Sequence, residues 1–510
     1  MPRVMVLIWT CSMLLFTANL IEGIPGLGVN WGHIASHNLE PTIVAKLLKD
    51  NGINKLKLFD SDPSIVKKFS GTGIEIMIGI QNKQLANFSE SLDSAKSWVE
   101  ENVTPLCKAD VNIKYVSVGN EVFLTFYNGS FVNSTFPALK NIQKALNEAG
   151  VGDKVKVTTA LNADVYDSGF QGPSGGNFRD DVRDLMVDIV KFFDANKSPF
   201  VVNIYPFINV YQTPTFPIDY AFFDGIAQPI IDNGLEYTNM FDANYDTLVV
   251  SLKKAGVPNV KIIIGEIGWP TDGDVHANIT MAKRFYDGFL KKMASNKGTP
   301  LRPGPIDAYL FSLMDEDLKS TLPGTFERHW GIFRYDGQPK FPIDFTGKNG
   351  KLVVGAKGVE YLPTQWCVFN KNNKNKTLVS ETFDWACLHG DCTSLGDGSS
   401  CNNLDDNGKF SYAFNMYYQM NNQLKEACDF DGLGTIVKKN ASEGTCLFPV
   451  QIATPKASTL GPAPAPTSTH IKGPASTITP ASASIGTGKR FDFMILTSVV
   501  GGLLILFILF

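Results

Sequence analysis

The sequence has little net charge. Its 510 residues contain 46 lysines and arginines against 50 aspartates and glutamates, which gives a net charge of −4. A nucleic-acid partner is excluded, because binding it requires a basic surface. Charged residues make up only 19% of the chain and hydrophobic residues 44%, so extensive disorder is excluded as well. This balance suits a secreted protein of about two to four domains that acts on a neutral ligand.

Cysteine is nearly absent from the first 366 residues, which contain only Cys11 and Cys107. An even cluster of six in an exported chain predicts a disulfide framework. The alternative is a zinc site, which is disfavoured because the chain has neither a C-x-x-C pair nor suitably spaced histidines. Cys107 is expected to be a buried free thiol. The six clustered cysteines are Cys367, Cys387, Cys392, Cys401, Cys428 and Cys446.

The N-terminal end is unlike the middle of the chain. Arg3 is followed by an apolar run from Val4 to Ile21, which ends at Glu22 and Gly23. A basic residue, an apolar stretch and a small residue at the break predict a secretory signal peptide over residues 1–23. A membrane anchor is the alternative, and it is disfavoured because the run is short and no basic cluster follows it.

The C-terminal end is apolar from Phe493 to Phe510. Upstream lie the small residues Ser482–Ser484 and an eight-residue spacer from Ile485 to Asp492. This order predicts a glycosylphosphatidylinositol (GPI) signal, with the lipid on Ser482 and residues 483–510 removed. The predicted partner is therefore the outer leaflet of the cell membrane. A retained tail-anchor helix is the alternative.

Residues 451–482 are expected to form an extended stalk. Of the 30 residues from Gln451 to Pro480, 20 are proline, alanine, serine or threonine, which cannot build a core. Asn-x-Ser/Thr sequons also fit an exported chain. The sequon at Asn196 is discounted because Pro199 follows it. The candidate N-glycosylation sites are Asn87, Asn102, Asn128, Asn133, Asn278, Asn375 and Asn440.

Residues 24–345 alternate short β-rich runs with amphipathic helical patterns, which predicts an α/β fold with a parallel sheet. Eight such runs in this length match a closed (β/α)8 (TIM) barrel. An open doubly wound sheet is the alternative, but no glycine-rich phosphate loop follows the first run. The runs are Leu27–Trp31, Lys55–Phe59, Glu75–Ile80, Tyr115–Gly119, Lys156–Leu161, Phe200–Tyr205, Lys261–Ile267 and Ile306–Met314.

Two glutamates interrupt apolar runs where barrel strands should end. Glu121 closes the fourth run and Glu266 lies near the end of the seventh. Reactive groups of such barrels gather at this face, and an unpaired buried carboxylate is costly. A structural role for each is the alternative. Two converging carboxylates are what glycoside hydrolysis needs, about 5–5.5 Å apart when the reaction retains configuration.

At these residues the chain resembles the plant β-1,3-glucanases of glycoside hydrolase family 17, which carry V-G-N-E and G-E-[TI]-G-W-P motifs. The resemblance implies that Glu121 is the proton donor and Glu266 the nucleophile. Residues 315–319 match the eighth-strand motif, with aspartates in place of its usual asparagines. Glu316 and Lys319 are then expected to support the catalytic pair, Lys319 by holding a carboxylate ionised and Glu316 by fixing Lys319.

The same resemblance implies the substrate-binding residues. Asn120 is expected to bind a sugar hydroxyl, Trp31 to stack on a sugar ring, and Tyr205 to hydrogen-bond near Glu266. Trp269 and Trp330 complete the expected set. For Trp31 and Trp330, a place in the core is an equally good interpretation.

Residues 365–450, after a linker over 346–364, resemble a family 43 carbohydrate-binding module. The resemblance implies the pairs Cys367–Cys428, Cys387–Cys392 and Cys401–Cys446, although the cysteine count alone allows fifteen pairings. The family often has tyrosine and proline after the fourth cysteine, where this chain has Asn402–Leu404. Three tyrosines are candidates for either a sugar platform or the core: Tyr412, Tyr417 and Tyr418.

The sequence therefore predicts a monomeric, cell-surface endo-β-1,3-glucanase that cleaves callose-type glucan with retention and needs no metal or organic cofactor. The cell wall, the apoplast and plasmodesmata are its expected surroundings. Two alternatives stay open: a callose-binding wall protein with weak or no catalysis, and a β-1,3-glucan transglycosylase.

Overall fold

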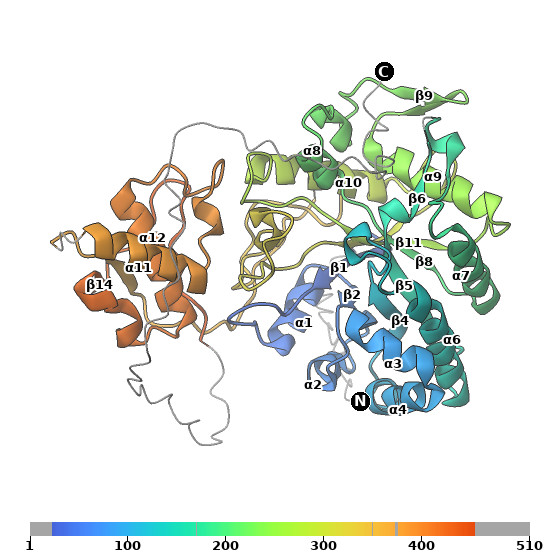
Figure 1. Cartoon of the computed structure of the whole chain (residues 1–510), viewed down its shortest axis with the longest axis horizontal. Helices are drawn as coiled ribbons and strands as arrows, with labels where there is room; N and C mark the ends of the chain where they lie inside the picture. The colour runs from blue at the N-terminus through green and yellow to red at the C-terminus, as the bar shows by residue number, and fades with distance from the viewer. Residues whose placement is uncertain (1–22, 170, 349, 373–375, 454–510) are drawn as a thin grey trace, which may run out of the picture.

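The computed structural model describes residues 23–169, 171–348, 350–372 and 376–453. Asn375, Ser482, most of the predicted stalk, the C-terminal apolar run and the predicted signal peptide before Gly23 lie outside these residues. None of the described helices is long and apolar enough to cross a membrane. Figure 1 shows a large unit, the barrel, beside a smaller unit built from residues 365–450, which we call the module.

Eight parallel strands close the barrel in the order β1-β12-β11-β8-β5-β4-β3-β2, which confirms the predicted TIM-barrel fold. Each strand falls within or overlaps one of the eight predicted runs. Side chains from six strands, Tyr115 and Tyr309 among them, fill the barrel interior as a layer. The strands are β1 (Leu27–Trp31), β2 (Lys55–Leu58), β3 (Glu75–Ile80), β4 (Ile113–Asn120), β5 (Lys156–Asn162), β8 (Phe200–Asn203), β11 (Ile262–Ile267) and β12 (Asp307–Leu310).

The sequences of the helices around the barrel have amphipathic patterns, and capping residues mark where some of these helices begin. In α10 (Ile279–Ala294), the Asn278 side chain accepts a hydrogen bond from the Met281 N–H, and one face buries Phe285, Phe289 and other apolar residues. The others are α1 (Pro41–Asp50), α2 (Pro63–Val66), α3 (Leu85–Glu90), α4 (Leu92–Asn102), α5 (Thr104–Lys108), α6 (Val132–Glu148), α7 (Arg183–Asn196), α8 (Pro206–Gln212) and α9 (Met240–Lys254).

Two antiparallel hairpins stand on long loops of the barrel. They pair β6 (Tyr166–Asp167) with β7 (Asn177–Phe178), and β9 (Ile230–Asp232) with β10 (Leu235–Tyr237). Cys107 is half-buried on α5 rather than fully buried as expected, and burial raises the pKa of its thiol. It forms no disulfide with any described residue.

The module is an antiparallel pair of strands with one helix, α12, packed on β13 and a second helix, α11, packed on α12. The strands are β13 (Trp366–Phe369) and β14 (Gly434–Val437), and the helices are α11 (Lys376–His389) and α12 (Asp406–Met420). Its disulfides are Cys367–Cys428, Cys387–Cys392 and Cys401–Cys446, the pairs that the family resemblance implies.

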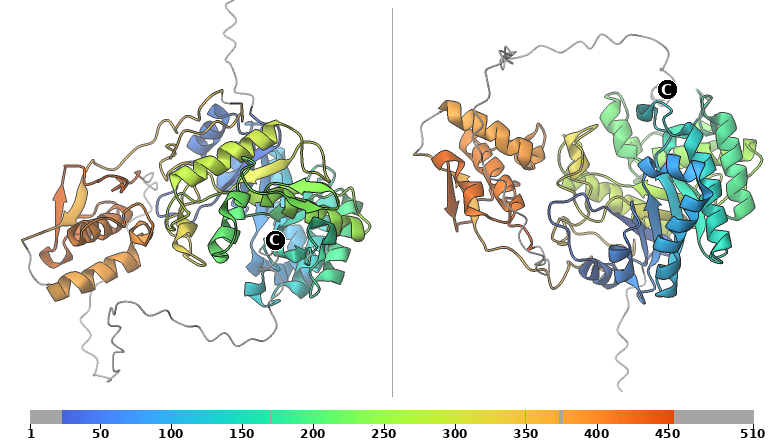
Figure 2. Two further views of the ribbon diagram at one scale, coloured as in Figure 1. Left: turned by 90° about the horizontal axis from the view of Figure 1, so that it is seen from above. Right: turned by 60° about the horizontal axis from the view of Figure 1, so that its bottom comes forward.

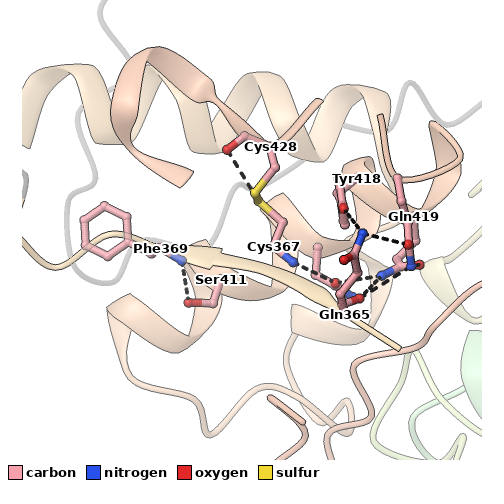
Figure 3. Close-up of a disulfide and its surroundings, with 9 residues drawn as sticks. Gln365, Cys367, Phe369, Ser411, Tyr418, Gln419 and Cys428 are labelled. Atoms are coloured by element: carbon pink, nitrogen blue, oxygen red, sulfur yellow. Dashed lines mark hydrogen bonds between the residues drawn. A yellow bond between two sulfur atoms is a disulfide. The ribbon is translucent and has the colours of Figure 1, made fainter. Parts of the chain in front are cut away.

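A small polar and apolar core surrounds the first of these disulfides (Figure 3). The Gln365 amide donates to the Tyr418 hydroxyl at 2.7 Å, and the Phe369 N–H donates to the Ser411 hydroxyl at 3.0 Å. Tyr412 and Tyr418 are buried, so both belong to the core and not to an open sugar platform. Such a small core depends on disulfides for stability.

Candidate active site

Both glutamates lie at the same end of the barrel, on strands whose pairing is locally irregular. Glu121 follows the last residue of β4, and Glu266 lies in β11. The β4–β5 register shifts between Ser117 and Asn120, and the β11–β8 register shifts before Glu266. Irregularities of this kind re-aim side chains and are frequent beside active sites.

The backbone at Glu121 is in an unusual conformation. Its φ is +52°, in the left-handed region that non-glycine residues rarely adopt, and it follows Gly119 with a φ of +82°. The Glu121 N–H donates to the Ala160 carbonyl at 2.7 Å, and the Asn82 amide bonds both backbone groups of Asn120. Conformations that are costly and held from several sides cluster at functional sites.

The Glu266 carboxylate is buried and both of its oxygens are bound. The Lys57 ammonium lies 2.7 Å from Oε1, and the Tyr205 hydroxyl donates to Oε2 at 2.6 Å. Burial, together with the charge of Glu266, raises the pKa of Tyr205 well above its usual value, so the hydroxyl stays a donor. A cation and a hydrogen bond together compensate a charge removed from water. Glu266 is thus held as a carboxylate.

Lys57 is a fully buried lysine on β2 that the sequence analysis did not identify. Its ammonium also lies 2.9 Å from the Asn30 side-chain oxygen and 3.9 Å from the centre of the Phe59 ring. Burial lowers the pKa of Lys57, while the charge of Glu266 opposes that shift. The signal available in the sequence was a lysine inside an apolar run, but its partner Glu266 is 209 residues away.

Glu121 has a different environment. The Asn203 amide donates to its Oε1 at 3.0 Å, and no described cation lies within ion-pair distance of its carboxyl. Burial, followed by the nearby charge of Glu266, raises the pKa of Glu121 to about 7. An acid and a nucleophile need different surroundings, and here Glu121 has a raised pKa while Glu266 has an ammonium and a hydroxyl on its two oxygens.

The supporting residues lie differently from expectation. The Lys319 ammonium is 2.7 Å from Glu327 Oε2 and 4.5 Å from the centre of the Phe311 ring. Glu316 instead accepts a hydrogen bond from the Ile34 N–H at 2.9 Å. The described residues contain no ion pair between Glu316 and Lys319. Burial raises the pKa of Glu316, and the nearby charge of Lys319 opposes that shift, so the two side chains do interact. The direct ion pair to the Glu266 carboxylate is made by Lys57.

Gly32 makes room for the Glu316 carboxyl. A Cβ atom at this position would lie 2.1 Å from Glu316 Oε1, much closer than atoms can approach. Only glycine therefore allows the carboxyl to reach the loop after β1, where its hydrogen bond with Ile34 is formed.

The three tryptophans expected to bind substrate are packed in the core. Trp31 is 2% exposed and meets the edges of His33 and Phe69, and Trp269 is 0% exposed. Trp330 lies against Tyr205, with ring centres 5.0 Å apart. None of the three rings presents an open face, so the stacking role expected of Trp31 is replaced by a packing role that supports the site.

Several buried polar atoms have no hydrogen-bond partner among the described residues, and two of those near the site are Asn120 Oδ1 and Trp330 Nε1. Buried polar groups are normally satisfied, so such atoms are candidates for contact with a ligand. One is an acceptor and the other a donor, as a sugar hydroxyl requires. Asn120 Oδ1 is thus available for the sugar hydroxyl that the sequence analysis expects it to bind, and Trp330 Nε1 is available as a donor.

The described sequons fall into two groups. Asn87, Asn128, Asn133 and Asn440 are exposed. Asn102 and Asn278 are half-buried, and each amide nitrogen donates to a backbone carbonyl, of Trp98 and Val275 respectively. The exposed group therefore offers the better acceptors for a glycan.

A closed (β/α)8 barrel that carries such a pair of glutamates at the ends of its strands is the architecture of a glycoside hydrolase. Comparison with known families identifies the particular one. The model of glycosyl hydrolases family 17 matches residues 27–345, and the chain belongs to this family. A model of the X8 domain matches residues 365–435, within the module.

Individual relatives agree with this assignment. The chain is 55% identical over 439 residues to glucan endo-1,3-beta-glucosidase 8 of Arabidopsis thaliana, covering 85% of this chain and 91% of the relative. It is 51% identical over 447 residues to glucan endo-1,3-beta-glucosidase 5 of the same plant, covering 87% and 92%. Among solved structures, a β-1,3-glucanase and allergen of Cryptomeria japonica pollen is 38% identical with a TM-score of 0.60, covering 63% of this chain and 99% of that one.

Proposed function

We propose that this protein is an endo-β-1,3-glucanase that hydrolyses callose-type glucan with retention of configuration. The observation that carries the proposal is the contrast between the two glutamates. Glu266 is held charged by Lys57 and Tyr205, whereas the pKa of Glu121 is raised to about 7. The glucan is taken from the relatives, which are named for the same activity at 55% and 51% identity.

In the first step, a Glu266 oxygen attacks the anomeric carbon and the bond to the leaving sugar breaks. Glu121 gives its proton to the departing oxygen. In the second step, Glu121, now a carboxylate, takes a proton from water, and the hydroxide oxygen displaces Glu266 from the sugar. Inversion twice at one carbon gives net retention. Lys57 and Tyr205 keep Glu266 charged and aimed before attack, and they receive it again as a carboxylate afterwards.

The module is proposed to hold glucan through its exposed aromatic residues. Trp385 on α11 is 43% exposed, stacks on His389 with ring centres 4.3 Å apart, and meets the edge of Tyr417 at 4.8 Å. Sugar rings bind to such faces because their C–H groups pack on aromatic carbon. A Trp385→Ala variant should lose most of its retention on insoluble β-1,3-glucan. Unchanged pull-down would remove this surface from the proposal.

We further propose that the chain is exported through a signal peptide over residues 1–23, glycosylated, and anchored as a monomer by a lipid on Ser482 at the end of a stalk over 451–482. The support is the residue pattern of the two ends. A phosphatidylinositol-specific phospholipase should release the protein from membranes. Peptides from Phe493–Phe510 in the mature, membrane-bound protein would contradict the lipid anchor.

Product analysis on laminarin tests the main proposal. Internal cleavage should give a series of short oligosaccharides, and nuclear magnetic resonance should detect the β-anomer at newly formed reducing ends before it equilibrates. Glu266→Gln, which keeps the size of the side chain, serves as the matched inactive control. First-formed α-anomer would overturn retention, and the absence of cleavage by the wild-type chain would overturn the activity.

A further inference from the structure

The module lies against the barrel face that carries the active site. Figures 1 and 2 show it beside the loops after β11 and β12 and the loop after β1. We call these loop 7 (residues 268–278), loop 8 (residues 311–336) and loop 1 (residues 32–40). Loop 7 follows the strand of Glu266, and loop 8 contains Glu316 and Lys319. The module therefore contacts the parts of the chain that complete the catalytic site.

A buried polar cluster joins loop 8 to the module. The Arg328 guanidinium donates to Asp391 at 3.1 Å, and the Thr393 hydroxyl, which donates to Asp391 at 2.5 Å, lies 2.7 Å from His329 Nε2. Because the hydroxyl has only one proton, His329 Nε2 is the donor in that bond. Asp391, Thr393 and His329 are all less than 9% exposed. Buried, mutually satisfied groups of this kind fix relative position.

The other two loops are bound as well. On loop 7, Asp272 accepts hydrogen bonds from the Ser400 N–H at 2.8 Å and from its hydroxyl at 2.5 Å. On loop 1, His37 Nε2 lies 3.0 Å from the Asn422 side-chain oxygen. Gly398 approaches loop 7 so closely that a Cβ atom there would lie 2.4 Å from the Val275 side chain. All three loops therefore have partners on the module.

The contacts of loop 8 lead directly to the site. The Arg328 Nε donates to the Lys319 carbonyl at 2.8 Å, while the His329 carbonyl accepts from the Thr271 N–H at 3.0 Å. Thr271 is five residues after Glu266 on the same strand and loop. A displacement of Arg328 or His329 would therefore move the backbone next to Lys319 and the chain that follows the nucleophile.

Both ends of the module are also attached to the barrel. Before it, Val354 forms two hydrogen bonds with the Asn51 side chain, at 2.7 and 3.0 Å. After it, the Tyr335 hydroxyl donates to the Val450 carbonyl at 2.7 Å, and Ile452 is 3% exposed within the barrel core. The two flanking segments pair with each other, since the Leu362 N–H donates to the Gln451 carbonyl. A freely hinged module would not need these attachments.

We propose that the module braces loops 1, 7 and 8, so that Asp391 and Thr393 act as positioning residues for hydrolysis, apart from any glucan that the module itself binds. This proposal rests on the proposed glucanase activity of the barrel. A brace acts on turnover, whereas a targeting module acts on the capture of polymer. The two roles therefore separate on a short, soluble β-1,3-gluco-oligosaccharide, where capture contributes little.

The test compares matched substitutions in the full chain. Thr393→Val removes the hydroxyl from the cluster, and Thr435→Val makes the same change at an exposed position of β14. Asp391→Asn is matched by Asp397→Asn, an exposed aspartate that makes no ion pair or hydrogen bond with any described residue. We expect Thr393→Val and Asp391→Asn to lower kcat on the short oligosaccharide about tenfold, with little change in KM. Thr393→Ser should restore kcat, and the two control variants should keep it.

Hydrogen exchange separates failure of the brace from failure of the proposed activity, because it needs no turnover. In Thr393→Val, amides of residues 315–330 should exchange faster than in the wild type, while those of β3 and β4 should not change. In the wild-type chain, loops 7 and 8 should be protected. Unchanged kcat in both cluster variants, or unchanged exchange over residues 315–330 in a folded Thr393→Val chain, would overturn the proposal.

Discussion

The barrel and the module solve the problem of stability by different means. The barrel has a large continuous core and can bury charged groups such as Lys57 and Glu266 in its interior, each offset by the other. The module has two small apolar clusters and three disulfides in less than a hundred residues. This difference in core size explains why the barrel, and not the module, carries the buried pair of charges. Paired buried charges require a rigid surrounding, and the barrel provides it.

The largest effect is expected at the catalytic pair. Glu266→Gln and Glu121→Gln should each lower kcat on laminarin by about a thousandfold or more, because one removes the nucleophile and the other the proton donor. Circular dichroism and thermal unfolding should stay close to the wild type, since the amide has the same size. Substantial turnover by either variant would contradict its assigned role.

The next largest effect is expected for Lys57, whose charge lies at the site, in comparison with Lys55, whose charge lies elsewhere on the same strand. Lys57→Met leaves Glu266 buried without its cation, so we expect kcat to fall about a hundredfold and the free energy of unfolding to fall by about 3–5 kcal/mol. Lys55→Met is the matched control. Lys55 lies two residues earlier on β2 and pairs with Asp307 at the opposite end of the barrel. The Lys55→Met variant should keep the kcat of the wild type, and an equal loss of kcat in the two variants would contradict a catalytic role for Lys57.

Chemical reduction of the disulfides should affect the stability of the two units differently. Each disulfide that is removed from a small domain costs about 2–5 kcal/mol, so a reducing agent should unfold the module and leave the barrel folded. Calorimetry should then show that the unfolding transition of the module is lost while that of the barrel is retained. Near-ultraviolet circular dichroism would report the tryptophans of each unit. A single unchanged transition after complete reduction would show that the module's own core suffices.

A smaller effect concerns the loop after β1. Gly32→Ala places a methyl group where Glu316 Oε1 now lies, so the carboxyl must move and its bond to the Ile34 N–H should be lost. We expect the free energy of unfolding to fall by about 1–3 kcal/mol and kcat to fall severalfold. Gly350→Ala is the control, because a Cβ atom there meets only the Thr346 hydroxyl oxygen, at an ordinary contact distance of 3.5 Å. Equal kcat in the two variants would contradict a role for this contact.

The dependence on pH tests the environment of Glu121. Burial and the charge of Glu266 raise its pKa to about 7, and the first step needs the protonated form. The value of kcat/KM should therefore be sustained below pH 7 and decrease as the pH rises through about 7. In Asn203→Ala, which removes a hydrogen bond that favours the charged form, this descending limb should move to higher pH. A limb that does not move would remove Asn203 from the account.

The sequence predicted what depends on local pattern. The alternation of apolar runs and helices identified all eight barrel strands. It also placed Glu121 and Glu266 near strand ends, where the structure has them, while their catalytic roles stay a prediction. Lys57 was missed because its role depends on a partner 209 residues away. The burial of Trp31 and the pairing of Lys319 with Glu327 depend on how loops pack, which has no periodic signal. The contacts between module and barrel arise in the same way, from loops with irregular structure.

The central claim is that Glu266 is a nucleophile held charged for attack while Glu121 supplies the proton. A β-1,3-linked disaccharide fluoride with fluorine in place of the hydroxyl beside the anomeric carbon tests it most directly. The fluorine beside the anomeric carbon slows both steps, whereas the good fluoride leaving group speeds only the formation of the glycosyl enzyme, so the intermediate accumulates. Mass spectrometry of peptides should place the sugar on Glu266, in the wild-type chain and not in Glu266→Gln. A label on Glu121 or another residue, or hydrolysis to the α-anomer without any label, would contradict the account.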